Sequence, residues 1–107
     1  MEFYIYNNSS GISEVQKALA LKIEKKYPEL INDLEIFLNT KIKEKDSKHS
    51  FFSTLSILKD LEVGFINIPS DPTDSSFWEI NYVEKRGLAI YGIEIKNWLP
   101  TELGVSA

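Results

Sequence analysis

The side chains best suited to chemistry in this 107-residue sequence are its carboxylates, because it contains no cysteine and a single histidine. Without cysteine, disulfides, thiolate-bound zinc, iron–sulfur clusters and thiol catalysis are excluded. His49 precedes Ser50, but sequence neighbours do not make a nucleophile–base pair, which also needs an orienting acid. We therefore expect His49 to be an exposed loop residue, and we expect no catalytic residue, no cofactor and no metal ligand.

The carboxylates are unevenly distributed along the chain. Six acids and no basic residue stand between residues 60 and 84, in a segment that also holds Phe65, Phe77, Trp78 and Tyr82. Carboxylates steer a basic partner during encounter, and aromatic side chains supply buried anchors at interfaces. The candidate partner-binding residues are therefore Asp71, Asp74, Trp78, Glu79, Tyr82 and Glu84. The alternative is that Trp78 is core and the acids are ordinary surface charge.

The loop 69–76 contains the oxygen donors Asp71, Thr73 and Asp74 and two prolines. Such oxygens bind calcium in some loops, but this one lacks the central glycine and the terminal bidentate glutamate of a calcium-binding loop. Asp, Ser and Pro are also the usual residues of turns. The sequence thus favours a structural loop and leaves cation binding open.

Nucleic acid and phosphate ligands are disfavoured by charge and by motif. The net charge is −4, and the basic residues include only one arginine, Arg86. Lysines gather at positions 41–48, but Glu44 and Asp46 interrupt them. Arginine usually leads at phosphate and base contacts, and no glycine-rich phosphate-binding motif occurs. The lysines are better explained as a solvated helix end, where cations suit the helix dipole.

The elements that must position these residues can be inferred from hydrophobic periodicity. Residues 2–6 alternate as in a short strand. An amphipathic helix is predicted to begin near Ser13 and to end before Pro28, where a second helix begins and runs to about residue 44. Residues 50–59 fit a short helix or a strand, and we favour the helix.

The second half of the chain has the two-residue period of strands. Strands are predicted over residues 61–68, 77–84 and 88–95, with a hairpin turn at 84–87 in which Gly87 takes positive φ. In the strand 77–84, the side chains of Trp78, Ile80 and Tyr82 share one face. Residues 97–107 are predicted to form a C-terminal tail.

These elements predict an α+β domain spanning residues 1–107, with two or three helices packed on an antiparallel sheet of about four strands. The sheet would consist of the first strand and a three-stranded meander. Both sides of the last two strands carry large apolar groups. Either the tail and the long loop cover the second face, or that face keeps an aromatic patch for a partner; we favour the former.

In its general character the chain resembles the small acidic immunity proteins of bacterial polymorphic toxin systems. The resemblance rests on the acidic loop 69–76 and the hairpin 77–95, which cover about a quarter of the chain and contain no diagnostic motif. It implies a protein that occludes a cognate toxin, and an acidic surface would complement the basic cleft of a nuclease toxin. It transfers no residue roles, because these proteins are diverse in fold.

We therefore expect a small cytoplasmic protein-binding module whose partner has a basic surface, acting on neither nucleic acid nor membrane. We expect no signal peptide, because residues 1–7 lack a basic region followed by a long apolar stretch, and the sequence contains no apolar run of membrane-spanning length. Two alternatives remain: a small carboxylate-dependent hydrolase, and a module that homodimerises or binds a ligand through the sheet. The sequence does not decide between a monomer and a homodimer.

Overall fold

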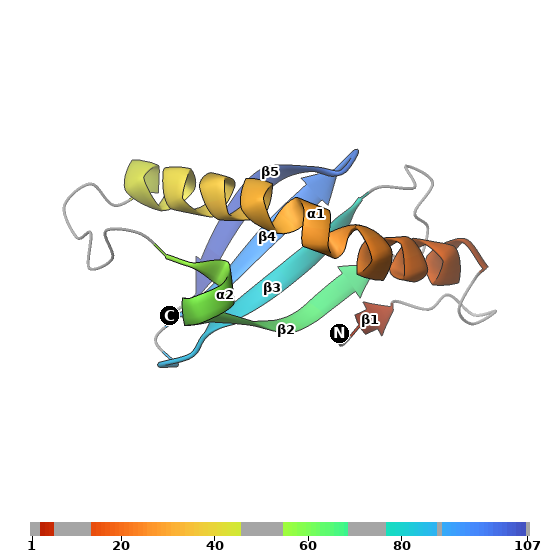
Figure 1. The fold of residues 1–107 in the computed structure, drawn as a ribbon, viewed down its shortest axis with the longest axis horizontal. Helices are drawn as coiled ribbons and strands as arrows, with labels where there is room; N and C mark the ends of the chain where they lie inside the picture. Colours follow the sequence, from red (N-terminus) through yellow and green to blue (C-terminus); the bar gives the residue numbers. More distant parts are fainter. Residues whose placement is uncertain (1–2, 6–13, 46–54, 69–76, 88, 107) are drawn as a thin grey trace.

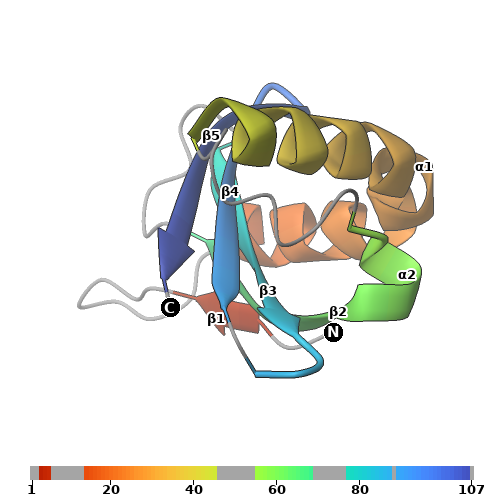
Figure 2. The same cartoon turned by 90° about the vertical axis from the view of Figure 1, so that its left-hand side faces the viewer.

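The computed structural model describes residues 3–5, 14–45, 55–68, 77–87 and 89–106. Two helices lie on one side of a five-stranded sheet (Figures 1 and 2), which confirms the predicted α+β class. The elements are, in chain order, β1 (Phe3–Ile5), α1 (Glu14–Lys45), α2 (Ile57–Asp60), β2 (Leu61–Ile68), β3 (Trp78–Glu84), β4 (Ile90–Lys96) and β5 (Leu99–Ser106).

The strands lie in the sheet in the same order as in the sequence, β1-β2-β3-β4-β5. The strands from β2 to β5 form an antiparallel meander, whereas β1 pairs with β2 in parallel. The prediction of an entirely antiparallel sheet was therefore wrong at β1. A parallel pairing is accommodated because the long α1 connection returns the chain across the sheet before β2 begins.

The prediction of a C-terminal tail was also wrong, because residues 99–106 form the edge strand β5. In this segment Leu103 and Val105 alternate with Glu102, Gly104 and Ser106, which is the period of a strand. A two-residue turn at Asn97 and Trp98, both with positive φ, joins β5 to β4. Such turns match the right-handed twist of paired strands.

The two helices predicted on either side of Pro28 are one helix, α1, with Pro28 in its interior. Proline removes one backbone hydrogen bond and costs a helix about 3 kcal/mol. The apolar stripe of Leu19, Ile23, Tyr27, Leu34 and Leu38 nevertheless keeps its helical period across position 28, and all but the half-buried Tyr27 are buried. Burial of one continuous stripe against the sheet outweighs the lost hydrogen bond.

The predicted short helix within residues 50–59 appears as the four-residue α2, while residues 50–54 lie outside the described part of the chain. Asn39 of α1 holds the approach to α2, since its side chain accepts from the Leu55 amide (2.8 Å) and donates to the Leu55 carbonyl (2.9 Å). The Glu35 carboxylate accepts from the Ile57 amide at 2.7 Å. These contacts fix α2 to the long helix.

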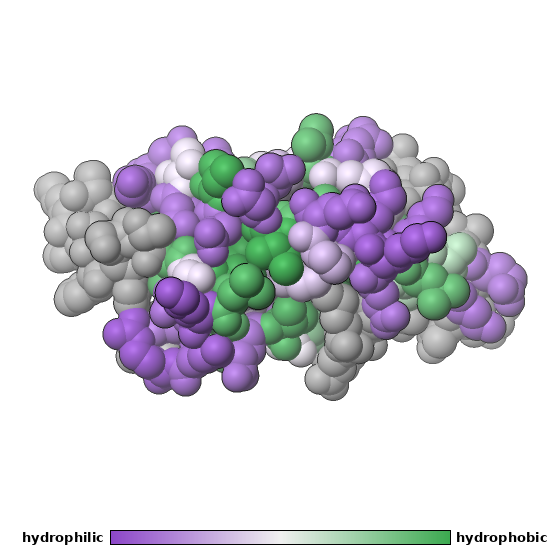
Figure 3. Space-filling view, in the orientation of Figure 1, coloured by the Kyte–Doolittle hydropathy of each residue, from purple (hydrophilic) through white to green (hydrophobic). Residues whose placement is uncertain are grey.

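The core lies between α1 and the helix-facing side of the sheet. Its sheet residues alternate along β3 as Trp78, Ile80 and Tyr82 and along β4 as Tyr91, Ile93 and Ile95. Trp98 from the β4–β5 turn packs edge-on against Trp78, with ring centroids 6.1 Å apart, and Lys26 lies 4.8 Å from the Trp98 ring centroid. On this side of the molecule, hydrophobic surface shows between α1 and α2, and the outward side of α1 is largely hydrophilic (Figure 3).

Candidate functional site

The structure divides the six candidate residues between the two faces of the sheet. Trp78, Tyr82 and Glu84 lie on the helix-facing side, and at most 2 % of each is exposed. Glu79 lies on the opposite face, because neighbouring strand residues point to opposite sides. Asp71 and Asp74 lie outside the described residues. Of the six, the described structure therefore leaves only Glu79 in reach of a partner.

The buried polar atoms of these three residues have specific surroundings. The Tyr82 hydroxyl is hydrogen-bonded to that of Tyr27 at 2.7 Å. Burial raises the pKa of Tyr82 far above its ordinary value, and the charge and hydrogen bond of Tyr27 act in the same direction. The Glu84 carboxylate pairs with Arg86. Glu84 Oε2 and Trp78 Nε1 are buried and make no hydrogen bond with any described residue. The side chains of Trp78, Tyr82 and Glu84 are therefore buried inside the protein and do not form a partner-binding surface.

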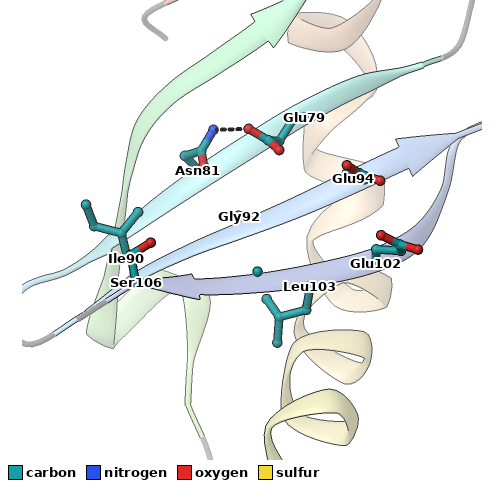
Figure 4. Close-up of a pocket in the computed structure, with 9 residues that line it drawn as sticks. Glu79, Asn81, Ile90, Gly92, Glu94, Glu102, Leu103 and Ser106 are labelled. Atoms are coloured by element: carbon teal, nitrogen blue, oxygen red, sulfur yellow. Dashed lines mark hydrogen bonds between the residues drawn. The ribbon is translucent and has the colours of Figure 1, made fainter. Parts of the chain in front are cut away.

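The face opposite the helices carries neither α1 nor α2 (Figure 2). Strand register arranges its side chains in rows across the sheet, because residues directly opposite each other point to the same side. One row consists of Asn67, Glu79, Glu94 and Glu102, from β2, β3, β4 and β5. We call Glu79, Glu94 and Glu102 the acidic row. Figure 4 shows these three carboxylates following one another across three adjacent strands.

Beside the acidic row, two residues away along each strand, lies a row whose members on β4 and β5 are glycines. It consists of Asn81, Gly92 and Gly104, which are opposite one another in the register. A groove of about 280 Å³ lies at this row, with the acidic row on one side and Ile90 and Ser106 on the other. We call this the glycine groove. Ile90 keeps 40 % of its surface exposed.

Two amides hold the first carboxylate of the acidic row. Glu79 Oε1 accepts from Asn67 Nδ2 and from Asn81 Nδ2, each at 3.0 Å. The side chains of Glu94 and Glu102 make no hydrogen bond or ion pair with any described residue. Two of the three charges are therefore open to a ligand, and the third is held in a fixed orientation.

Within the described residues, the acidic row does not form a metal centre. No group of three or more His, Asp or Glu side chains in that part of the chain is arranged to hold a metal ion. The hypothesis of cation binding concerns loop 69–76, which lies outside the described residues. Spaced carboxylates on three strands instead suit an extended cationic surface, which meets each of them separately.

Glu94 and Glu102 were not among the predicted site residues, and their signal was present in the sequence. Glu94 alternates with Ile93 and Ile95, just as Glu79 alternates with Trp78 and Ile80. Glu102 was missed because its segment was interpreted as a tail. Their alignment with Glu79 depends on strand register, which sequence alone does not provide.

None of the helices in the described ranges is long and apolar enough to cross a membrane. Comparison of the chain with protein-family models, with curated proteins and with solved structures finds no match. The site must therefore be interpreted from its own residues.

Proposed function

We propose that this protein is a binding module that docks a protein partner with a basic surface onto the helix-free face of its sheet. The observation that carries this proposal is the acidic row, Glu79, Glu94 and Glu102, on three adjacent strands of the face that carries neither of the described helices. Like charges directly opposite each other in a sheet are destabilising. A basic partner would relieve that repulsion on binding, so the arrangement favours association over the free state.

The charges around the acidic row support a basic partner rather than a second copy of the chain. Glu62 lies on the same face, opposite Val83, and adds a fourth carboxylate. Lys96, two residues after Glu94 on β4, is the one lysine or arginine within the described strands β2 to β5. Two copies meeting through this face would bring two acidic rows together, which repulsion opposes.

The sequence resemblance suggests which kind of partner to propose. In the manner of the small acidic immunity proteins, the module would occlude a basic toxin in the cytoplasm and block the toxin's own substrate site. A nuclease toxin fits best, because a cleft that binds nucleic acid is basic. The acidic row would then occupy the position that phosphates take in the toxin's substrate.

A matched pair of charge-reversal variants tests the proposed surface. Glu94→Lys/Glu102→Lys reverses two charges of the acidic row, and Glu24→Lys/Glu29→Lys reverses two exposed charges on α1. Both variants change the net charge equally, so they separate the face from the overall charge. Affinity capture from the native cell identifies the partner, and surface plasmon resonance then measures association at several salt concentrations.

We expect the row variant to slow association by about tenfold or more, while the helix variant stays near wild type. Added salt should slow the wild-type association and affect the row variant less. The proposal fails if both variants bind alike, or if the captured partner presents an acidic contact surface. A sedimentation measurement on the free protein addresses the homodimer alternative, which predicts a concentration-dependent mass.

A further inference from the structure

We infer that the glycine groove receives a single lysine side chain of the partner. The inference rests on the proposed function and specifies the chemistry of its central contact. The lysine stem would lie over Gly104, and its ammonium group would lie among the acidic row and the Asn81 side chain. The groove volume, an unused acceptor and the distribution of apolar surface carry the inference.

The space above the sheet differs between Gly92 on β4 and Gly104 on β5. A Cβ atom built on Gly104 would meet no atom within 4 Å, so the space above it is open. A Cβ on Gly92 would lie 2.8 Å from Asn81 Oδ1 and 3.8 Å from Glu79 Cδ, so the side chains of Asn81 and Glu79 already occupy the space above Gly92. Gly104 thus supplies the open part of a depression of about 280 Å³, whereas the Asn81 and Glu79 side chains lie over Gly92.

Asn81 Oδ1 is an acceptor for which no described residue supplies a donor. Asn81 is 7 % exposed, and its Nδ2 donates to Glu79 Oε1. That bond fixes the amide, and Asn81 Oδ1 then points over Gly92 without a hydrogen bond to any described residue. An amide oxygen held in this orientation can accept a hydrogen bond from a ligand.

The arrangement of the acceptors favours lysine over arginine. The acceptors around the groove are single groups on different residues, namely Asn81 Oδ1, Glu94 and Glu102. An ammonium is a compact charge with three donors, which can satisfy acceptors on several sides. The planar arginine fork would be held by the two oxygens of one carboxylate, such as that of Glu94, and it matches acceptors on separate residues less well. The acidic row lies about 7 Å from the glycine row along each strand, so a stem that lies over Gly104 brings the ammonium to the carboxylates and to Asn81 Oδ1 over Gly92.

One side of the groove is apolar. Ile90 is partly exposed there, on the side away from the acidic row. A lysine stem consists of apolar methylenes below a charged tip. The groove therefore matches lysine in polarity from end to end, with Ile90 and Gly104 beside the stem and carboxylates around the tip.

The test uses a neutral-ended probe peptide, acetyl-Gly-Gly-Lys-Gly-Gly-amide, titrated into the ¹⁵N-labelled full chain. We expect saturable shifts confined to the amides of Gly92 and Gly104 and the Asn81 side-chain amide, with a Kd in the millimolar range, typical of a ligand with few contact atoms. The same peptide with Nε-acetyllysine keeps the stem and loses the charge, and should bind at least fivefold more weakly. An arginine peptide that binds as tightly as the lysine peptide would contradict the choice of lysine.

Gly104→Val fills the groove without removing a carboxylate, and Glu62→Gln removes a carboxylate of the same face outside the groove. We expect the first to weaken peptide binding at least fivefold and the second to leave it within twofold, once circular dichroism shows both variants folded. Glu102→Gln provides a second loss-of-binding variant should Gly104→Val fold poorly.

The outcomes separate this inference from the proposed function. If the wild type shows no saturable shift, or Gly104→Val binds the peptide like the wild type, insertion into the groove is overturned. The proposed function still stands in that case if the row variant Glu94→Lys/Glu102→Lys loses the captured partner. If partner binding is unaffected by that variant, the proposed function fails by its own measurement.

Discussion

Because the acidic row places like charges opposite one another, we expect that replacing Glu94 by glutamine stabilises the free protein. Glu94 is the central member, opposite Glu79 on β3 and opposite Glu102 on β5. The substitution therefore removes both like-charge pairs at once. Glutamine keeps the size and shape of the side chain, so packing should change little. A gain in stability on removal of a charge would show that the row is maintained at a cost to folding.

The magnitude follows from the geometry of the register. Opposed pairs in a sheet contribute about 0.2–1 kcal/mol each, unfavourably for like charges. Two such pairs give a gain of about 1 kcal/mol, from which the lost attraction to Lys96 is subtracted. Lys96 forms no ion pair within 4.0 Å with a described residue, so that loss is small. We expect a net gain of about 0.5–1 kcal/mol and a rise in Tm of roughly 2–6 °C.

The assay is thermal and urea unfolding at low salt and at high salt, with Glu62→Gln as the control. Glu62 lies opposite Val83 rather than opposite an acid, so its removal should change stability much less. Salt should stabilise the wild type more than Glu94→Gln, because screening weakens the repulsion that the variant lacks. If Glu94→Gln were no more stable than the wild type at low salt, or kept the same salt dependence, the reasoning about the acidic row would be refuted.

Three further predictions concern groups that hold the sheet and the helix together. Trp98 has a positive φ of 63°. Trp98→Gly should therefore be less destabilising than Trp98→Ala by about 1 kcal/mol in urea unfolding, because both variants lose the ring but only alanine keeps the backbone strain of a positive φ. Equal losses of stability in the two variants would argue against strain. Arg86→Ala should destabilise by about 1–3 kcal/mol because Glu84 stays buried and unpaired, and adding Glu84→Gln should recover part of the loss; a purely additive double mutant would show no coupling. Burial raises the pKa of both Tyr27 and Tyr82 above the ordinary 10.0, so the folded state holds these protons more tightly than the unfolded state, and stability should fall as the pH rises above about 10. Tyr82→Phe should flatten that fall in unfolding measured from pH 8 to 11, and an unchanged slope would assign the effect to other groups.

The contrast between β3 and α1 shows how far periodicity alone can be trusted. In β3, alternation correctly separated Trp78, Ile80 and Tyr82 from Glu79, because a strand has only two faces. In α1, Pro28 was given more weight than the apolar stripe that continues past it. A proline signal is local, whereas the benefit of one unbroken stripe appears only when the sheet is present to cover it.

Composition and alternation by themselves determined the α+β class, the Trp78 face of β3, and the gathering of acids without basic neighbours in one segment. Tertiary structure alone decided that Trp78, Tyr82 and Glu84 are covered by the helix layer, and that Glu79 faces the other way beside Glu94 and Glu102. The physical reason is that a local pattern assigns a residue to a face but not to a neighbour. Neighbours across a sheet are set by register and by which face the helix covers, and both depend on contacts between residues far apart in the chain.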